Sequence, residues 1–152
     1  MKSAIPEDLR PLIGNRVYGC DDCQLACPWN KFAQLASEAD FKTVRNGLDA
    51  ASLLDLFAWS EDEFKQRMAG SAILRIGYAK WLSNLAIGLG NALRAGNGLR
   101  SGASLRAAPG AILDDASAKK RIHQGLQGRA DHESAMVRES VAWALGQAEI
   151  SA

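Results

Sequence analysis

Cysteine is scarce in this sequence, and its distribution is uneven. Only three cysteines occur among 152 residues, and all of them lie between positions 20 and 27. An odd number of cysteines leaves one unpaired in any disulfide framework, and the amino-terminal residues lack the apolar core of a signal peptide. Both observations argue against a secreted, disulfide-linked protein and favour reduced thiols in the cytoplasm.

Long apolar runs and an excess of charge are also absent. No apolar run approaches the roughly 20 residues that a membrane-spanning helix needs, so we expect no membrane association. The 18 basic and 17 acidic residues nearly cancel, which leaves a net charge of +1. Bulk charge therefore does not mark a nucleic-acid-binding protein, and any such surface has to come from local clusters of basic side chains.

The stretch that carries chemistry is the cysteine segment, whose spacing is Cys20-x2-Cys23-x3-Cys27-Pro28. Bacterial ferredoxin-type segments follow the pattern Cys-x2-Cys-x2-Cys-x3-Cys-Pro, and this stretch supplies the last three cysteines of such a run. A cubane iron–sulfur cluster needs four ligands, so the chain is expected either to be incomplete or to borrow ligands. A zinc site and unliganded structural cysteines remain alternatives, although the two histidines lie far downstream without the spacing of zinc ligands.

A longer pattern surrounds these cysteines. Residues 13–32 resemble the second cysteine segment of the epoxyqueuosine reductase family. Residues 5–10 resemble the lead-in of that family, residues 131–145 resemble its closing helical repeat, and shorter matches occur at 70–71 and 89–92. The resemblance implies the C-terminal portion of such a protein. The upstream part of the family, with the cobalamin-binding domain, the catalytic acid and five further cluster cysteines, is then expected to be encoded before the first residue of this chain.

The resemblance also implies roles for the cysteine segment. Cys20 and Cys23 would ligate the second of two [4Fe–4S] clusters, and Cys27 would cross over to the first cluster, nearer the cobalamin. Asp21 lies beside the thiolates and is a candidate cobalamin-facing residue, with a solvated turn as the alternative. Two aromatic side chains are expected to pack over the cluster loop and keep water out, namely Trp29 and Phe32.

The activity implied by the resemblance is the reduction of epoxyqueuosine to queuosine in tRNA. Electrons would pass from a reducing donor through the two clusters to cobalamin in a monomeric full-length oxidoreductase, and the 152-residue chain alone is expected to be inactive. The helical tail is expected to hold the anticodon stem-loop through phosphate contacts, which are salt-sensitive and carry little sequence information. An ordinary solvated face is the alternative for the basic residues concerned, which are Lys119, Lys120, Arg121, Arg129 and Arg138.

The predicted fold class is mainly α. It combines the C-terminal half of a two-cluster ferredoxin-like segment with a small HEAT-like helical repeat domain. We divide the chain into a partial [4Fe–4S] segment (1–36), a helical connecting region (37–95), a flexible linker (96–111) and a HEAT-like helical pair (112–152). A single helical pair cannot bury its own apolar face, so it is expected to stack on the preceding helix.

Helix signals are clear in the second half of the chain. A capping box begins at Ser60, where a serine is followed three residues later by a glutamate. In the longest helix, Lys80 and Asn84 are candidates for the polar face, while Gly88 and Gly90 suggest close packing against another helix. The predicted helices cover 52–57, 60–68, 78–95, 112–129 and 135–147.

Two functions of other classes remain open. The chain could be a small electron-transfer module fused to a helical adaptor, with a separate partner supplying the missing cluster ligands. Iron retained only in complex with another polypeptide would favour that function. Alternatively it could be a non-enzymatic helical repeat scaffold with structural cysteines. Replacement of all three cysteines by alanine would then leave iron content, fold and binding unchanged.

Overall fold

The computed structural model describes residues 3–19, 22–39, 43, 46–48, 51–94 and 115–148 of the chain. Every regular element in these ranges is helical, and none of them contains a strand. In chain order, with η for a 3-10 helix, the elements are η1 (Glu7–Leu9), α1 (Arg10–Ile13), α2 (Asp22–Leu25), η2 (Pro28–Phe32), α3 (Leu53–Ala58), α4 (Glu61–Arg67), η4 (Ala72–Ile76), α5 (Tyr78–Arg94), α6 (Asp115–Gln127) and α7 (Ala135–Gly146). The predicted mainly α class is therefore confirmed for the described residues.

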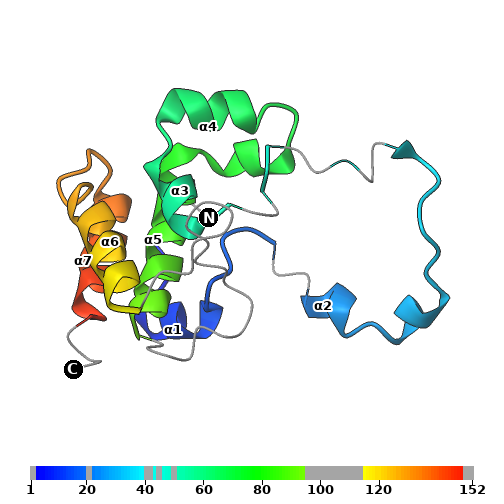
Figure 1. Cartoon of the computed structure of the whole chain (residues 1–152), viewed down its shortest axis with the longest axis horizontal. Helices are drawn as coiled ribbons and strands as arrows, with labels where there is room; N and C mark the ends of the chain where they lie inside the picture. Colours follow the sequence, from blue (N-terminus) through cyan, green and yellow to red (C-terminus); the bar gives the residue numbers. More distant parts are fainter. Residues whose placement is uncertain are drawn as a thin grey trace.

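Three parts can be distinguished in Figure 1. The helical body comprises α3 to α7. The lead segment, residues 3–19, packs against this body and contains η1 and α1. The cysteine arm, residues 22–39, contains α2 and η2 and stands apart from the body in the view of Figure 1. No helix in the described ranges combines the length and the apolar character needed to cross a lipid bilayer.

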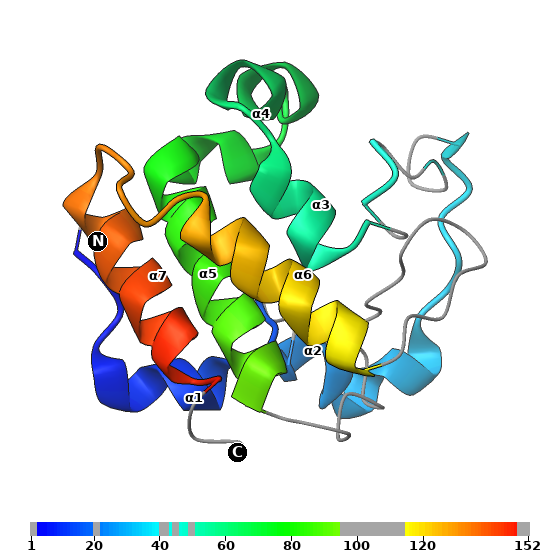
Figure 2. The same ribbon diagram turned by 60° about the vertical axis from the view of Figure 1, so that its left-hand side comes forward.

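Helix α5 is the centre of the helical body. It was predicted over 78–95 and runs over Tyr78–Arg94. Eleven of its residues are buried, because α3, α4, α6 and α7 all contact it, as the side-by-side helices in Figure 2 illustrate. Its apolar side chains form one continuous core with those of the neighbouring helices. The predicted stacking of the last two helices on α5 is confirmed.

The contact between α5 and α7 is close because of a glycine. A Cβ atom at Gly90 would lie 2.7 Å from Cζ3 of Trp143 and 2.8 Å from Cα of Ala144. Carbon atoms pack best at about 3.5–4.0 Å, so the two helices can approach this closely only where a side chain is missing. A buried hydrogen bond of 2.8 Å between the hydroxyls of Ser83 and Ser140 joins the same two helices. The expectation that Gly90 serves helix packing is confirmed.

The short helices begin at capping boxes. At α4 the Ser60 hydroxyl accepts from the Glu63 backbone N–H (3.2 Å), and the Glu63 carboxylate accepts from the Ser60 N–H (2.8 Å). This box was predicted, and a second one, formed by Ser52 and Asp55 at α3, was not. Each box satisfies two backbone donors that would otherwise lack partners at a helix start. Helices of six and seven residues are therefore well defined at their first turn.

The final helical pair agrees in part with its prediction. Helices α6 and α7 contact each other and α5, with Ile122, Leu126, Val137 and Val141 buried between them. The predicted start of the first helix at 112 and the predicted linker over 96–111 lie outside the described residues. Ser134 occupies the predicted N-cap position of α7, but its side chain makes no capping hydrogen bond.

Candidate functional site

The cysteine arm is a short chain of helical turns. Cys23 lies on α2 with an exposed side chain, and Cys27 is half-buried at the residue preceding η2. Pro28 occupies the first position of η2, where its missing N–H costs no helical hydrogen bond. The Cys27 backbone N–H donates to the carbonyl of Gln24 (3.1 Å), which continues the turn begun by α2. The two cysteines are therefore about one helical turn apart along the chain.

The cysteines of the arm have the right ligand atoms for an iron–sulfur cluster, but the chain has fewer cysteines than one cluster needs. Thiols are the ligands that such clusters use, and Cys23 is accessible from outside the protein. Cys20 and Asp21, the other predicted residues of this loop, lie outside the described residues. Within the described ranges, no three cysteine, histidine or acidic side chains are grouped closely enough to hold a metal ion. The described part of the chain therefore offers two thiols, Cys23 and Cys27, which is fewer than the four ligands that one cluster needs.

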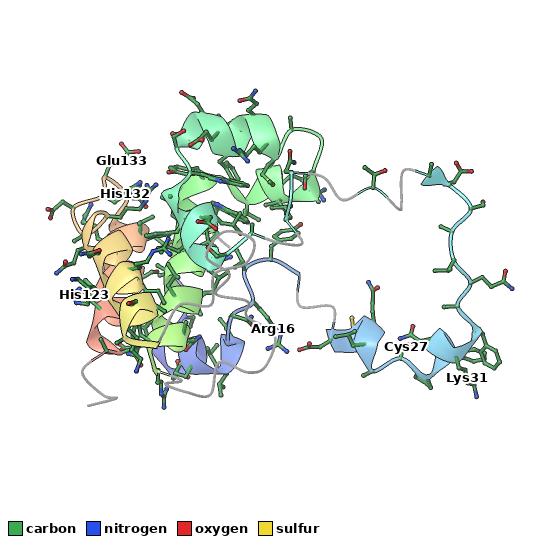
Figure 3. All side chains as sticks on the ribbon, viewed as in Figure 1. Arg16, Cys27, Lys31, His123, His132 and Glu133 are labelled. Atoms are coloured by element: carbon green, nitrogen blue, oxygen red, sulfur yellow. The ribbon has the colours of Figure 1, made fainter. Side chains whose placement is uncertain are left out.

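Figure 3 shows how the possible ligands are distributed. Cys27 lies on the cysteine arm, whereas His123 and His132 lie on the far side of the helical body. The Nδ1 atom of His132 accepts a hydrogen bond from the Ser134 backbone N–H (3.1 Å), so this side chain orders the turn before α7. This contact gives His132 a structural role in the loop between α6 and α7.

The aromatic side chains of the arm do not cover the cysteines as expected. Trp29 is 72% exposed and Phe32 is 63% exposed, and their ring centroids lie 5.5 Å apart. Leu25 and Leu35 on the same arm are also exposed. The expectation that Trp29 and Phe32 exclude water from the loop is wrong for this structure, because none of the described segments packs over these rings.

The lead segment is bound to the body by a polar stripe on α5. The Asn91 side-chain amide donates to the backbone carbonyls of Arg10 (2.8 Å) and Gly14 (2.7 Å). Asn84 donates to the carbonyl of Val17 (2.8 Å), just before the cysteine segment. Lys80, four residues earlier on α5, donates to the carbonyl of Ser3 (3.0 Å). The polar side of α5 therefore binds backbone of the lead segment rather than solvent.

Partial burial affects the titration of Lys80. Removal of its ammonium group from water lowers the pKa of this lysine.

Asn91 was not recognised from the sequence as a functional residue. Its signal was its spacing from Asn84, since residues seven apart lie on the same side of a helix.

A buried arginine provides a second attachment. Arg10 is 2% exposed, and its guanidinium forms an ion pair with Glu139 of α7. The same side chain donates through Nε to the carbonyl of Ile5 (2.9 Å) and lies over the ring of Trp143 (5.8 Å to the centroid). This role could not be predicted from local sequence patterns, because Arg10 and Glu139 are 129 positions apart. Arg10 joins the lead segment to the last helix.

The five basic residues predicted to contact RNA have different surroundings. Arg129 is half-buried, with its guanidinium over the ring of Phe57 (5.2 Å) and donating to the carbonyl of Trp59 (2.9 Å). Arg138 donates to the carbonyls of His132 (2.7 Å) and Glu133 (2.8 Å) before its own helix. The other three lie on α6, with Lys119 half-buried and both Lys120 and Arg121 exposed.

The sequence was compared with known proteins. No protein-family model matches the chain. The epoxyqueuosine reductase of Burkholderia pseudomallei is 59% identical over 147 residues, which cover 95% of this chain and 32% of that protein. The epoxyqueuosine reductase of Pseudomonas aeruginosa is 46% identical over 144 residues, covering 95% and 33% respectively. The chain thus spans about a third of the length of the curated relatives it matches.

The fold was compared with solved structures. A crystal structure of an epoxyqueuosine reductase with an epoxyqueuosine-modified tRNA-Tyr stem loop superposes with a TM-score of 0.57 at 22% sequence identity. The superposition covers 98% of this chain and 42% of that structure, so the arrangement of helices is shared. The resemblance predicted from the cysteine segment is therefore confirmed: over nearly its whole length, this chain is similar to about a third of an epoxyqueuosine reductase.

Proposed function

We propose that this chain forms the C-terminal part of an epoxyqueuosine reductase, which reduces epoxyqueuosine to queuosine in tRNA. The observation that carries the proposal is the 59% identity to the Burkholderia relative over 95% of the chain. The cysteine spacing supports it as well, because Cys-x2-Cys-x3-Cys-Pro matches the last three cysteines of a ferredoxin-type run.

In this proposal the cysteine arm carries electron transfer. Cys20 and Cys23 would hold the second [4Fe–4S] cluster, Cys27 the first, and Asp21 would face the cobalamin. A bound cluster supplies one-electron transfer at low potential. The exposed thiol of Cys23 and the exposed apolar side chains around it are consistent with an arm that contacts further protein surface of the ferredoxin-like segment.

The helical body has two tasks in this proposal. It holds the lead segment, and through it the cysteine arm, by the hydrogen bonds from the polar stripe of α5 and by the Arg10–Glu139 ion pair. It would also contact the anticodon stem-loop as a HEAT-like unit. The relative crystallised with a tRNA stem loop supports this second task, since its fold covers 98% of the chain.

A chimaera tests the proposal. The matching third of the Burkholderia enzyme is replaced by this chain, and queuosine in tRNA is measured by mass spectrometry in a strain that lacks its own epoxyqueuosine reductase. We expect queuosine to be restored and the anaerobically purified chimaera to contain iron and sulfide. The test variants are Cys23→Ser and Cys27→Ser, which should each lose iron and queuosine, and the control is Gln66→Ala, which changes an exposed side chain on α4.

Two results would contradict the proposal. An iron-containing chimaera that is folded but produces no queuosine would show that the chain does not support the reaction. Full activity in both cysteine variants would show that these thiols carry no electron-transfer role.

A further inference from the structure

A groove lies between α3 and α6 on the helical body. Its volume is about 440 Å³, which is within the range of about 300–1,000 Å³ typical of ligand sites. Leu54 and Ala58 form its apolar side on α3. Arg121 and Gln124 line it from α6, and Arg129 closes one end just after that helix.

Two glycines line this groove, one on α6 and one just after it. A Cβ atom at Gly125 would lie 2.6 Å from Cδ1 of Leu54, so the two helices are in close contact there. Just after the end of α6, a Cβ atom at Gly128 would meet only the backbone oxygens of Gln124 and Gly125, both at 3.6 Å. A Cβ atom at Gly128 would therefore make only ordinary van der Waals contacts, and Gly128 is one of the residues that line the groove.

The charge of the groove has one sign. Arg121 and Arg129 both line it, and no carboxylate occurs among its described lining residues. The guanidinium of Arg129 is held by the Trp59 carbonyl and lies over the rings of Phe57 and Tyr78. Its position is thus fixed before any ligand arrives, which reduces the entropy lost on binding.

Arg121 supplies the solvent-exposed cation of the groove. Its side chain is exposed, and a guanidinium presents donors in a planar fork that matches two phosphate oxygens. The exposed amide of Gln124, one turn away on the same side of α6, can donate to a neighbouring oxygen. Two cations and an amide beside an apolar wall complement a phosphodiester and its attached sugar.

We propose that the groove between α3 and α6 binds a phosphodiester group of an RNA strand, with Arg121 as the contacting cation and Arg129 as a positioning residue that stabilises the groove. The proposal rests on the proposed function, which supplies a tRNA stem-loop as the ligand. The proposal distinguishes basic residues that line the groove from those that do not. Lys120 lies on α6 beside Arg121 but does not line the groove.

The test is the affinity of the 152-residue chain for a fluorescently labelled anticodon stem-loop RNA, measured by anisotropy at two or more salt concentrations. Arg121→Gln should weaken binding about tenfold, because a charge-assisted hydrogen bond is lost. The slope of log K against log salt should fall by about 0.7–0.9, as expected for one phosphate contact. Lys120→Gln removes the same charge one position away and should weaken binding by less than about threefold.

A third variant tests whether RNA binding needs the volume of the groove in addition to its positive charge. Gly128→Leu retains every cation and fills the groove, and it should weaken binding about as much as Arg121→Gln does. Thermal unfolding of each variant should match the wild-type chain, which shows that the loss reflects the groove and not the fold.

Three outcomes would overturn the proposal. Equal losses for Arg121→Gln and Lys120→Gln would show a diffuse charge effect while leaving the proposed function intact. Unchanged binding in a folded Gly128→Leu variant would show that RNA does not enter the groove. No binding by the wild-type chain would refute both the groove and the RNA contact in the proposed function.

Discussion

Replacement of Gly90 by alanine would test the packing that holds the last helix on the body. The added methyl group would lie 2.7 Å from Cζ3 of Trp143 and within 2.9 Å of both Cα and Cβ of Ala144. Two of these three atoms belong to the rigid part of α7, so a rotamer change of Trp143 alone cannot relieve the overlap. The two helices have to separate along their contact.

The magnitude follows from two opposing contributions. Alanine at a helix interior position is favoured over glycine by about 1 kcal/mol. Overpacking a core typically costs about 1–3 kcal/mol, and an overlap with backbone belongs at the upper end of that range. We therefore expect Gly90→Ala to lower the free energy of unfolding by about 1–2 kcal/mol.

Gly88→Ala is the matched control on the same helix. Its Cβ would lie 3.1 Å from Cδ1 of Leu53, the end of a side chain that can change rotamer. The propensity gain of about 1 kcal/mol should then offset most of the crowding, so the stability of this variant should stay within about 1 kcal/mol of wild type.

Urea unfolding followed by far-UV circular dichroism measures both variants, with the free energy obtained by linear extrapolation. Equal stability of the two variants, with unchanged m-values, would refute the argument, because it would mean that α7 can move away from α5 at no cost.

Three further predictions concern the attachments and caps. Glu139→Gln should lower the free energy of unfolding by about 1.5–3 kcal/mol in the same assay, because the buried Arg10 guanidinium loses its ionised partner. An unchanged free energy of unfolding in the Glu139→Gln variant would contradict this. Asn91→Ala should cost about 1–3 kcal/mol, since two backbone carbonyls lose their donor. Amide exchange over residues 3–14 should also accelerate, whereas uniform acceleration along the chain would argue against a local role. The hydrogen bonds from the backbone and then the side chain of Ser60 lower the pKa of Glu63, so the unfolded chain binds more protons in acid. The stability that this carboxylate contributes is complete above the ordinary glutamate pKa of about 4.3 and is lost as the pH falls through the lower folded value. Glu63→Gln should remove that part of the acid sensitivity between about pH 5 and 3, and an identical pH profile would contradict the argument.

Local features of this protein were predictable from sequence because they depend on residues close together in the chain. The Ser60 capping box needs only a serine and a glutamate three positions apart. The apolar spacing of α5 and the glycines within it follow from helical periodicity. The cysteine pattern and the stretches around it were sufficient to recognise the similarity to epoxyqueuosine reductases.

The roles of several polar residues were decided only when the helices packed. From the sequence alone, Asn84 and Asn91 look like solvent-exposed residues on the polar face of an amphipathic helix. Their role appears only in the folded protein, where both side chains donate hydrogen bonds to the backbone of the lead segment. Arg129 was predicted as a cation available to RNA, but its guanidinium stacks on Phe57 in the body.

The sequence by itself determined the helices α3, α4, α5 and α7 and the stretch that carries the thiols, because each of these is encoded within a few neighbouring residues. Only the tertiary structure decided that Arg10 is buried against Glu139 and that α3 and α6 enclose a groove lined by two arginines. The physical reason is the same in both cases. The ion pair of a buried arginine and an interhelical groove both depend on distances between residues far apart in the chain, which are set by the packing of the whole core.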